Sequence, residues 1–196
     1  MVLPNFIIVG VQKGGTTWLS QILSEHPQVF LPKPEIHFFD KNANFDQGIK
    51  WYEKHFAEAN NYLAIGEKTP EYLYKQEKHK VIKEYLPNIK SIVVLRNPVT
   101  RALSHLNHLF RSGYYPISIN PEEIIFDRSS TVLDRGFYFQ QLNSYFQVYN
   151  PEQVLILINE EDIAIDGNIA LKTTCDFLNI DSSFEFWTLD KKQLLA

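Results

Sequence analysis

The stretch FIIVGVQKGGTTWL, residues 6–19, decides the fold. Its first four residues, Phe6 to Val9, form an apolar run rich in β-branched side chains, which predicts a strand buried on both faces. A turn with three glycines follows at residues 10–15, and a helical pattern then begins at Thr16 and Thr17. The order of strand, glycine-rich turn and helix N-terminus is typical of a site that binds phosphate.

The chemistry of this turn suits an anion. Gly14 and Gly15 let backbone N–H groups turn inward, and the first N–H groups of a helix have no partner within it. Lys13 adds a full positive charge, while Thr16 and Thr17 add hydroxyl donors. A glycine-rich turn that binds no ligand is the alternative interpretation.

A comparison with the nucleoside-triphosphatase pattern GxxxxGK[ST] narrows the prediction. Gly10, Gly15 and Thr17 lie near the positions that the pattern requires. Thr16, however, stands where the lysine belongs, and Lys13 lies earlier, inside the loop. The turn is therefore predicted to keep the phosphate cradle without the lysine that contacts a γ-phosphate.

Length and composition indicate one domain, residues 1–196, with a substantial core. Hydrophobic residues make up 44% and charged residues 21%, and the net charge of −4 argues against a nucleic-acid polymer as partner. The single cysteine, Cys175, is expected in the core rather than as a nucleophile. Because no apolar run approaches the ~20 residues of a membrane span, we expect a soluble, cytoplasmic protein.

Strand patterns alternate with helix patterns along the rest of the chain. They predict an α/β fold, a P-loop-like three-layer sandwich with a central, mostly parallel sheet flanked by helices. Ligands then bind at the carboxyl ends of the strands, in the loops near residues 10–17, 67–72, 96–104 and 159–162. The expected strands are 61–66, 90–95 and 153–159; the expected helices are 46–56, 75–85, 98–111, 137–149 and 168–178; and residues 113–130 are expected to form a long loop.

Two further groups of residues carry candidate chemistry. Arg96 ends the strand KSIVVL, where a triphosphatase would often place an acidic residue for Mg²⁺, and it favours an anion instead. Ser104, on the next helix, could add a hydroxyl; a surface ion pair and a helix filler are the alternatives for these two residues. Glu35 and His37 would project to the same side of an extended segment. Burial among apolar neighbours would raise the pKa of Glu35 and suit it to act as a base. The alternatives are a solvated carboxylate for Glu35 and a structural hydrogen bonder for His37.

Four motifs together resemble the sulfotransferases that use 3′-phosphoadenosine 5′-phosphosulfate (PAPS). They are VGVQKGGTTWL, PEIHFFD, GEKTPEYL and VVLRNPVTRALSHLNH, and residues 135–163 resemble the family's next helix–strand unit. Their order and spacing are closest to the heparan-sulfate glucosaminyl branch and its bacterial relatives. The resemblance covers roughly residues 6–179 and implies transfer of a sulfuryl group to a hydroxyl, or an amine, of a carbohydrate-like or small-molecule acceptor, with release of 3′-phosphoadenosine 5′-phosphate (PAP) and no required metal.

The resemblance also implies roles for individual residues. Lys13, Gly14, Gly15, Thr16 and Thr17 would cradle the 5′-phosphosulfate, and the 3′-phosphate would lie on Arg96 and Ser104. Glu35 matches the general base, with His37 beside it in the acceptor site, and Lys68 matches a lysine near the transferring group.

One departure from the family keeps other functions open. Family members usually continue into a basic, glycine-containing loop that covers the nucleotide, and no such loop is found before Ala196. A module that binds PAP or PAPS without turnover is therefore one alternative. A P-loop kinase for a small substrate is the other, although the position of Lys13 and the strand end at Arg96 count against it.

Overall fold

The computed structural model describes residues 2–188 of the chain. Five parallel strands form one sheet in the order β2-β3-β1-β4-β5, with β1 (Phe6–Gly10) at its centre. The other strands are β2 (Val29–Phe30), β3 (Ala64–Lys68), β4 (Lys90–Leu95) and β5 (Val154–Ile158). This arrangement confirms the predicted α/β class and the parallel sheet.

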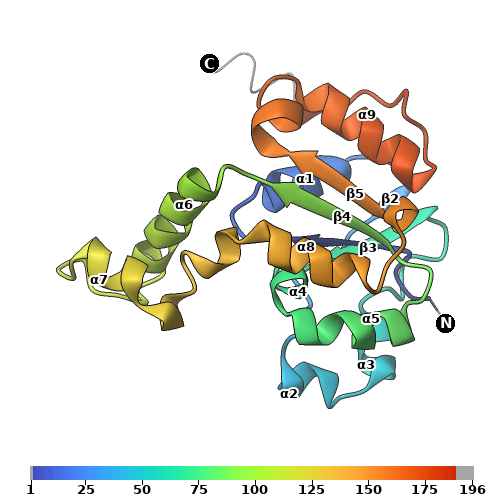
Figure 1. The fold of residues 1–196 in the computed structure, drawn as a ribbon. Helices are drawn as coiled ribbons and strands as arrows, with labels where there is room; N and C mark the ends of the chain where they lie inside the picture. Colours follow the sequence, from blue (N-terminus) through green and yellow to red (C-terminus); the bar gives the residue numbers. More distant parts are fainter. Residues whose placement is uncertain (1, 189–196) are drawn as a thin grey trace.

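Alternating side chains of the central strand divide the core into two halves. Phe6 and Ile8 pack on one face of β1, with apolar residues of α1 (Thr16–Leu23) and α9 (Gly167–Leu178). Ile7 and Val9 pack on the other face, because successive side chains of a strand point to opposite sides. Figure 1 shows the resulting three layers, with α9 and α1 on one face of the sheet and α4, α5 and α8 on the other.

The second face carries the remaining helices of the body. They are α2 (Asn42–Phe45), α3 (Ile49–Lys54), α4 (Glu71–Tyr74), α5 (His79–Tyr85) and α8 (Tyr138–Phe146). Two more helices, α6 (Pro98–Arg111) and α7 (Pro121–Phe126), extend to one side of the sheet (Figure 1). All five strands are parallel, so the loops that follow them meet at one edge of the sheet.

Several boundary predictions hold closely. The strand at 90–95 and the helix at 98–111 have the predicted limits, and Asn97 caps that helix by accepting hydrogen bonds from the N–H groups of Val99 and Thr100. Pro98 occupies the first helical turn, where its missing N–H costs nothing. Cys175 is fully buried, and burial raises the pKa of its thiol to about 11, as expected of a core residue.

Three element predictions were wrong. The expected helix at 46–56 is shorter, because Gly48 takes a φ of 76° and the helix, α3, begins only after it, at Ile49, and ends at Lys54; α2 lies before residue 46. The strand expected at 61–66 runs instead from Ala64 to Lys68, and Glu71 begins a helix rather than continuing a polar loop. The expected loop at 113–130 contains α7, which Asn120 caps and Pro121 begins. The end of the chain, 189–196, lies outside the described residues.

Candidate active site

The turn between β1 and α1 lies close to the neighbouring strands. A Cβ atom on Gly14 would come within 2.2 Å of the backbone oxygen of Val94, so only glycine fits against β4 there. Gly15 has a φ of 119°, in the left-handed region that favours glycine. The side-chain amide of Asn159, which follows β5, donates a 2.9 Å hydrogen bond to the backbone oxygen of Gly14. These contacts fix the turn and leave the first N–H groups of α1 facing the pocket beyond it.

Cations gather on this side of the pocket. Lys13 has a φ of 68°, which is uncommon for a residue with a side chain and is retained where the surrounding structure holds it. Burial lowers the pKa of the Lys13 ammonium, and the nearby charges of Arg111 and Arg96 lower it further. The Arg96 guanidinium donates a 3.1 Å hydrogen bond from Nε to Thr100 Oγ1, which leaves its other nitrogens for a ligand. Positive charges that disfavour one another in this way are stabilised by a bound anion.

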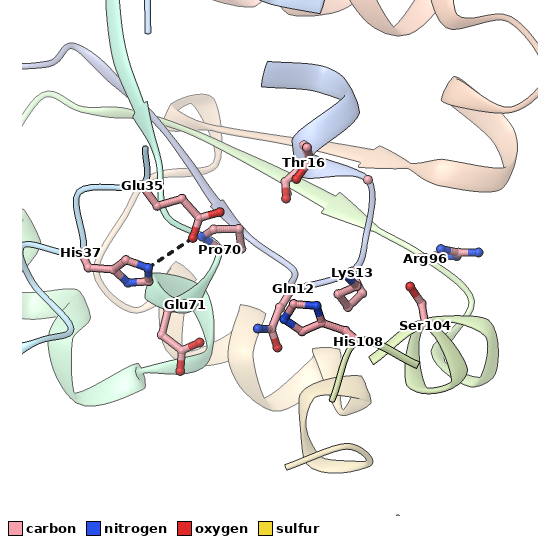
Figure 2. A pocket seen from close by; sticks show the side chains of 12 residues that line it. Gln12, Lys13, Thr16, Glu35, His37, Pro70, Glu71, Arg96, Ser104 and His108 are labelled. Carbon is pink, nitrogen blue, oxygen red and sulfur yellow. Dashed lines mark ion pairs between the residues drawn. The ribbon is translucent and has the colours of Figure 1, made fainter. Parts of the chain in front are cut away.

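The opposite side of the pocket is formed by residues 35–40 and the end of β3. Lys68 Nζ lies 2.6 Å from Glu35 Oε1, and His37 Nε2 lies 3.3 Å from Glu35 Oε2. The other ring nitrogen of His37 lies 2.8 Å from Asp40 Oδ2. Lys68 also donates a 3.4 Å hydrogen bond to Thr17 Oγ1, which connects this side to the start of α1. Figure 2 shows Glu35 and His37 facing Lys13, Arg96 and Ser104 across the pocket.

The expectation of a raised pKa at Glu35 was wrong. Burial does raise the pKa of this carboxyl, but the hydrogen bonds from His37 and Lys68 outweigh burial, and the pKa lies below its ordinary value. The hydrogen bonds of His37 to Asp40 and Glu35 raise the pKa of the imidazole to about 9. At neutral pH the structure therefore places an ionised Glu35 between two cations.

Most of the predicted residues surround one pocket of about 470 Å³. Glu35 and His37 line it opposite Arg96 and Ser104, and the turn contributes Lys13, Gly15, Thr16 and Thr17. Gly14 lies behind the pocket against β4, so its part in the cradle is close packing. Lys68 lines an adjoining hollow of about 120 Å³ together with Thr17 and Glu35.

The structure adds residues that the sequence argument did not assign to the site. Gln12, Pro70, Glu71 and His108 also line the pocket, and a neighbouring pocket of about 430 Å³ joins Arg111 and His108 to Lys13, Arg96 and Ser104. Helical spacing could have found His108 and Arg111, because they lie four and seven residues after Ser104 and share its face. Asp40 could have been found from the motif PEIHFFD, but nothing in the sequence shows that its carboxylate turns back to His37.

The comparisons with known proteins identify the family. A family model described as "Sulfotransferase domain" matches residues 3–193, and the chain therefore belongs to this family. It is 30% identical over 164 residues to mouse heparan sulfate glucosamine 3-O-sulfotransferase 5, covering 79% of this chain and 47% of the relative. It is 36% identical over 140 residues to the membrane-associated sulfotransferase kil1 of Dictyostelium discoideum, covering 67% of this chain and 29% of the relative. The chain thus spans about half, or less, of the length of these curated relatives.

Solved structures agree on the fold. A sulfotransferase from Alicyclobacillus acidocaldarius superposes with a TM-score of 0.84 at 26% identity, covering 94% of this chain and 84% of the other. Mouse sulfotransferase SULT7A1, solved in complex with PAP, superposes with a TM-score of 0.60 at 23% identity, covering 91% and 59%. These likenesses confirm the predicted P-loop-like sandwich. Among residues 2–188, no helix has the length and apolar character needed to cross a membrane.

Proposed function

We propose that this chain transfers a sulfuryl group from PAPS to a hydroxyl group of a carbohydrate-like or small-molecule acceptor and releases PAP. The observation that carries this proposal is the division of one pocket into two chemically different sides. Lys13, Arg96 and the N-terminus of α1 offer positive charge on one side, and Glu35 offers an ionised base on the other. Membership of the sulfotransferase family supports the same reaction.

The residues present fit a nucleotide that carries two phosphate groups. Gly15, Thr16 and Thr17 present backbone and hydroxyl donors at a helix N-terminus, and Lys13 stands beside them. Arg96 and Ser104 form a second group of donors on the same pocket, and we assign the 3′-phosphate to them. PAPS, when bound, supplies the activated sulfuryl group. No ion pair among the described residues involves Lys13 or Arg96, so both charges are free for such a ligand.

The chain's own residues account for the proton and for the charge of the leaving group. As the acceptor oxygen forms its bond to sulfur, Glu35 takes the hydroxyl proton, which its ionised state at neutral pH allows. Lys13 and the N–H groups of α1 would hold the phosphate that leaves when its oxygen–sulfur bond breaks, and would stabilise the negative charge that this phosphate gains. Lys68 contacts one oxygen of the Glu35 carboxylate and His37 contacts the other, so together they orient the carboxylate.

This arrangement does not favour a kinase. Thr16 occupies the position where a nucleoside triphosphatase places its lysine, and Arg96 stands at the strand end where an acidic residue would help hold Mg²⁺.

The acceptor class is proposed from the relatives, several of which are named as glucosamine 3-O-sulfotransferases. We also propose that the protein acts in the cytoplasm and that residues 1–196 form a single domain.

A transfer assay tests the proposed function. The purified chain is incubated with PAPS labelled in the sulfuryl group and with a panel of glucosamine-containing oligosaccharides and small hydroxyl compounds. Labelled product should form with at least one acceptor, and Glu35→Gln should remove most of the turnover. Turnover of ATP that requires Mg²⁺, with no transfer from PAPS, would contradict the proposal and favour a kinase.

A further inference from the structure

Glu67 is a buried carboxylate that the proposed mechanism does not use. It lies one residue before Lys68 at the end of β3, and its exposed fraction is 1%. Because successive side chains of a strand point to opposite sides, Lys68 reaches Glu35 while Glu67 points into the core. A buried carboxylate is costly unless hydrogen bonds satisfy it, so its partners indicate what it does.

Three hydroxyl groups donate to Glu67. The Tyr52 hydroxyl lies 2.5 Å from Oε1, the Thr69 hydroxyl 2.9 Å from Oε2, and the Tyr72 hydroxyl 3.2 Å from Oε1. An ionised carboxylate only accepts hydrogen bonds, so it fixes the direction in which each of these hydroxyl hydrogens points. Burial raises the pKa of Glu67 to about 7, and the hydrogen bonds from the three hydroxyls oppose that rise.

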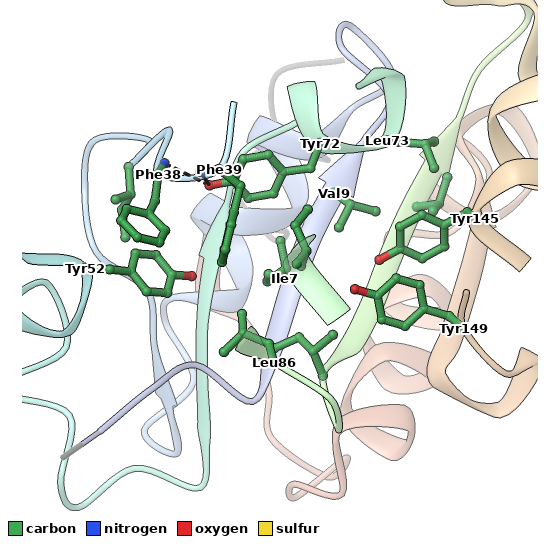
Figure 3. Packing of buried hydrophobic residues seen from close by; sticks show 14 of the residues in the cluster. Ile7, Val9, Phe38, Phe39, Tyr52, Tyr72, Leu73, Leu86, Tyr145 and Tyr149 are labelled. Atoms are coloured by element: carbon green, nitrogen blue, oxygen red, sulfur yellow. Dashed lines mark hydrogen bonds between the residues drawn. The ribbon is translucent and has the colours of Figure 1, made fainter. Parts of the chain in front are cut away.

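Two of these hydroxyl groups also accept hydrogen bonds from backbone N–H groups of the segment that carries Glu35 and His37. Tyr72 donates its single hydroxyl hydrogen to Glu67, and its oxygen accepts hydrogen bonds from the N–H groups of Phe38 at 3.0 Å and Phe39 at 3.3 Å. Figure 3 shows the Tyr72 hydroxyl turned toward Phe38 and Phe39. Thr69 Oγ1 accepts a longer hydrogen bond, 3.5 Å, from the N–H group of His37. The carboxylate therefore reaches three consecutive backbone N–H groups through two hydroxyls.

This segment needs support from its surroundings. His37 has a φ of 54°, a left-handed conformation that is unfavourable for a residue with a side chain. The side-chain amide of Asn44 donates to the backbone oxygens of Ile36 and His37, at 3.0 and 3.1 Å, and so holds the carbonyl groups. Glu67, through Tyr72 and Thr69, holds the N–H groups of the same segment.

We propose that Glu67 is a positioning residue for sulfuryl transfer: through Tyr72 and Thr69 it fixes the backbone of residues 37–39, and thereby the placement of His37 against Glu35. Neighbouring residues of β3 then act on the same segment from two sides, Lys68 on the Glu35 side chain and Glu67 on the backbone. The inference rests on the proposed function in taking Glu35 as the base.

A pair of matched variants tests this inference. Tyr72→Phe removes the hydroxyl that connects Glu67 to Phe38 and Phe39 and keeps the ring in the core. Tyr145→Phe removes a comparable buried hydroxyl in the same half of the core, which lies 2.6 Å from Ser91 Oγ on β4 rather than near β3. We expect kcat to fall about tenfold or more in Tyr72→Phe. PAP affinity should stay within about twofold of wild type in both variants, and Tyr145→Phe should keep the wild-type kcat.

Glu67→Gln tests the carboxylate itself. The amide has the same size but presents N–H donors toward hydroxyls that already donate, so kcat should fall at least as far as in Tyr72→Phe. Should Glu67→Gln fail to fold, Tyr72→Phe still decides the matter. Equal kcat values in Tyr72→Phe and Tyr145→Phe, or losses that follow only the melting temperatures, would overturn the inference.

A second readout needs no activity. The imidazole of His37 can be followed by NMR during a pH titration, with its signals assigned by comparison with His37→Gln. The wild-type midpoint should lie near 9. In Tyr72→Phe and Glu67→Gln it should move down by about one unit, toward the ordinary histidine value, because His37 leaves its partners. Tyr145→Phe should leave it in place.

The two readouts separate the inference from the function it rests on. A His37 midpoint that stays near 9 in folded Tyr72→Phe would overturn the positioning role, whatever the turnover of the wild type. A shifted midpoint in a chain that transfers no sulfuryl group to any acceptor would retain the positioning role and reject the proposed function.

Discussion

The two sides of the pocket hold their charged groups in opposite ways. On the side of α1 and α6, the ion pairs found within residues 2–188 leave Lys13, Arg96 and Arg111 unused. On the side of β3 and residues 35–40, Glu35 contacts both Lys68 and His37. Among residues 2–188, the first side has positive charge without an ion-pair partner, whereas the charges of the second side are paired within the protein.

This difference indicates separate tasks. Unpaired cations at a helix N-terminus gain most from a bound anion. Burial lowers the pKa of Lys13, and the charges of Arg111 and Arg96 lower it further. A carboxylate held by two donors is fixed in position and stays in the ionised form, which is the form that can accept a proton. Loss of Arg96 or Arg111 should therefore weaken nucleotide binding, and loss of Glu35 should slow the reaction. Loss of Lys13 should do both, because Lys13 is also proposed to stabilise the leaving phosphate.

The largest expected effect follows from Lys13→Ala. In the proposed reaction Lys13 stabilises the negative charge that develops on the leaving phosphate, so its removal should lower kcat by about 1,000-fold. The assay with labelled PAPS measures this loss. Lys54→Ala, which removes an exposed lysine from α3, is the matched control and should keep wild-type activity. Activity of Lys13→Ala within a few-fold of wild type would exclude the assigned role.

Glu35→Gln should have the next largest effect. The amide keeps the size of the side chain but cannot take a proton, so kcat should fall about 100-fold. The Michaelis constant for PAPS should stay within about twofold, because Glu35 lies on the other side of the pocket from Arg96. Steady-state kinetics with varied PAPS separates the two parameters. Equal losses in kcat and in PAPS affinity would mean that Glu35 supports the structure rather than the reaction.

Arg111→Ala should have a smaller effect, confined to binding. Arg111 lines the neighbouring pocket with Arg96 and lowers the pKa of Lys13, so it adds to the positive field that an anion meets. We expect the Kd for PAP to rise about three- to tenfold, and less so at high salt, because salt screens an exposed charge. Lys50→Ala, on α3, is the control and should leave the Kd unchanged. A Kd for Arg111→Ala that matched the control would remove Arg111 from the anion-binding side.

The smallest expected effect concerns stability and pH. The folded-state pKa of His37 is raised from 6.5 to about 9, so its contribution to stability is complete below pH 6.5 and is lost as pH rises through about 9. Over this range the melting temperature of the wild type should fall by about 2–4 °C more than that of His37→Gln. Calorimetric scans at pH 6.5 and 9.5 give the comparison. Parallel curves for the two proteins would show that His37 is not charged beside Glu35 and Asp40.

Much of the fold could be predicted from the sequence because its signals are local. The apolar run at residues 6–9 and the capped helix after Asn97 are decided by neighbours in the chain, and both were confirmed. The end of β3 was predicted wrongly, because Glu67 and Lys68 look like loop residues until their partners are known. Tyr52 and Tyr72 make the buried position of Glu67 tolerable, and no periodicity shows those contacts.

The pocket, like the fold, has features that could be predicted from the sequence and features that could not. Most of its lining residues could be predicted from motifs and from the rule that ligands bind at the carboxyl ends of parallel strands. The electrostatics could not, because the pKa of Glu35 depends on hydrogen bonds from His37 in its own segment and from Lys68 on a separate strand, β3. Burial among Ile36, Phe38 and Phe39 pointed to a raised pKa, but the contacts with His37 and Lys68 reverse the direction. Whether a carboxylate is desolvated or paired is a property of the tertiary structure.

The most direct test of separate tasks is a calorimetric titration with PAP, in the absence of Mg²⁺, on the wild type, Arg96→Ala and Glu35→Gln. Arg96→Ala removes the charged hydrogen bonds proposed to hold the 3′-phosphate, so the Kd for PAP should rise about 10- to 100-fold. Glu35→Gln should bind PAP within about twofold of wild type. A Kd for Arg96→Ala that matches wild type, or an equal loss in both variants, would contradict the division of the pocket into a side for the nucleotide and a side for the proton.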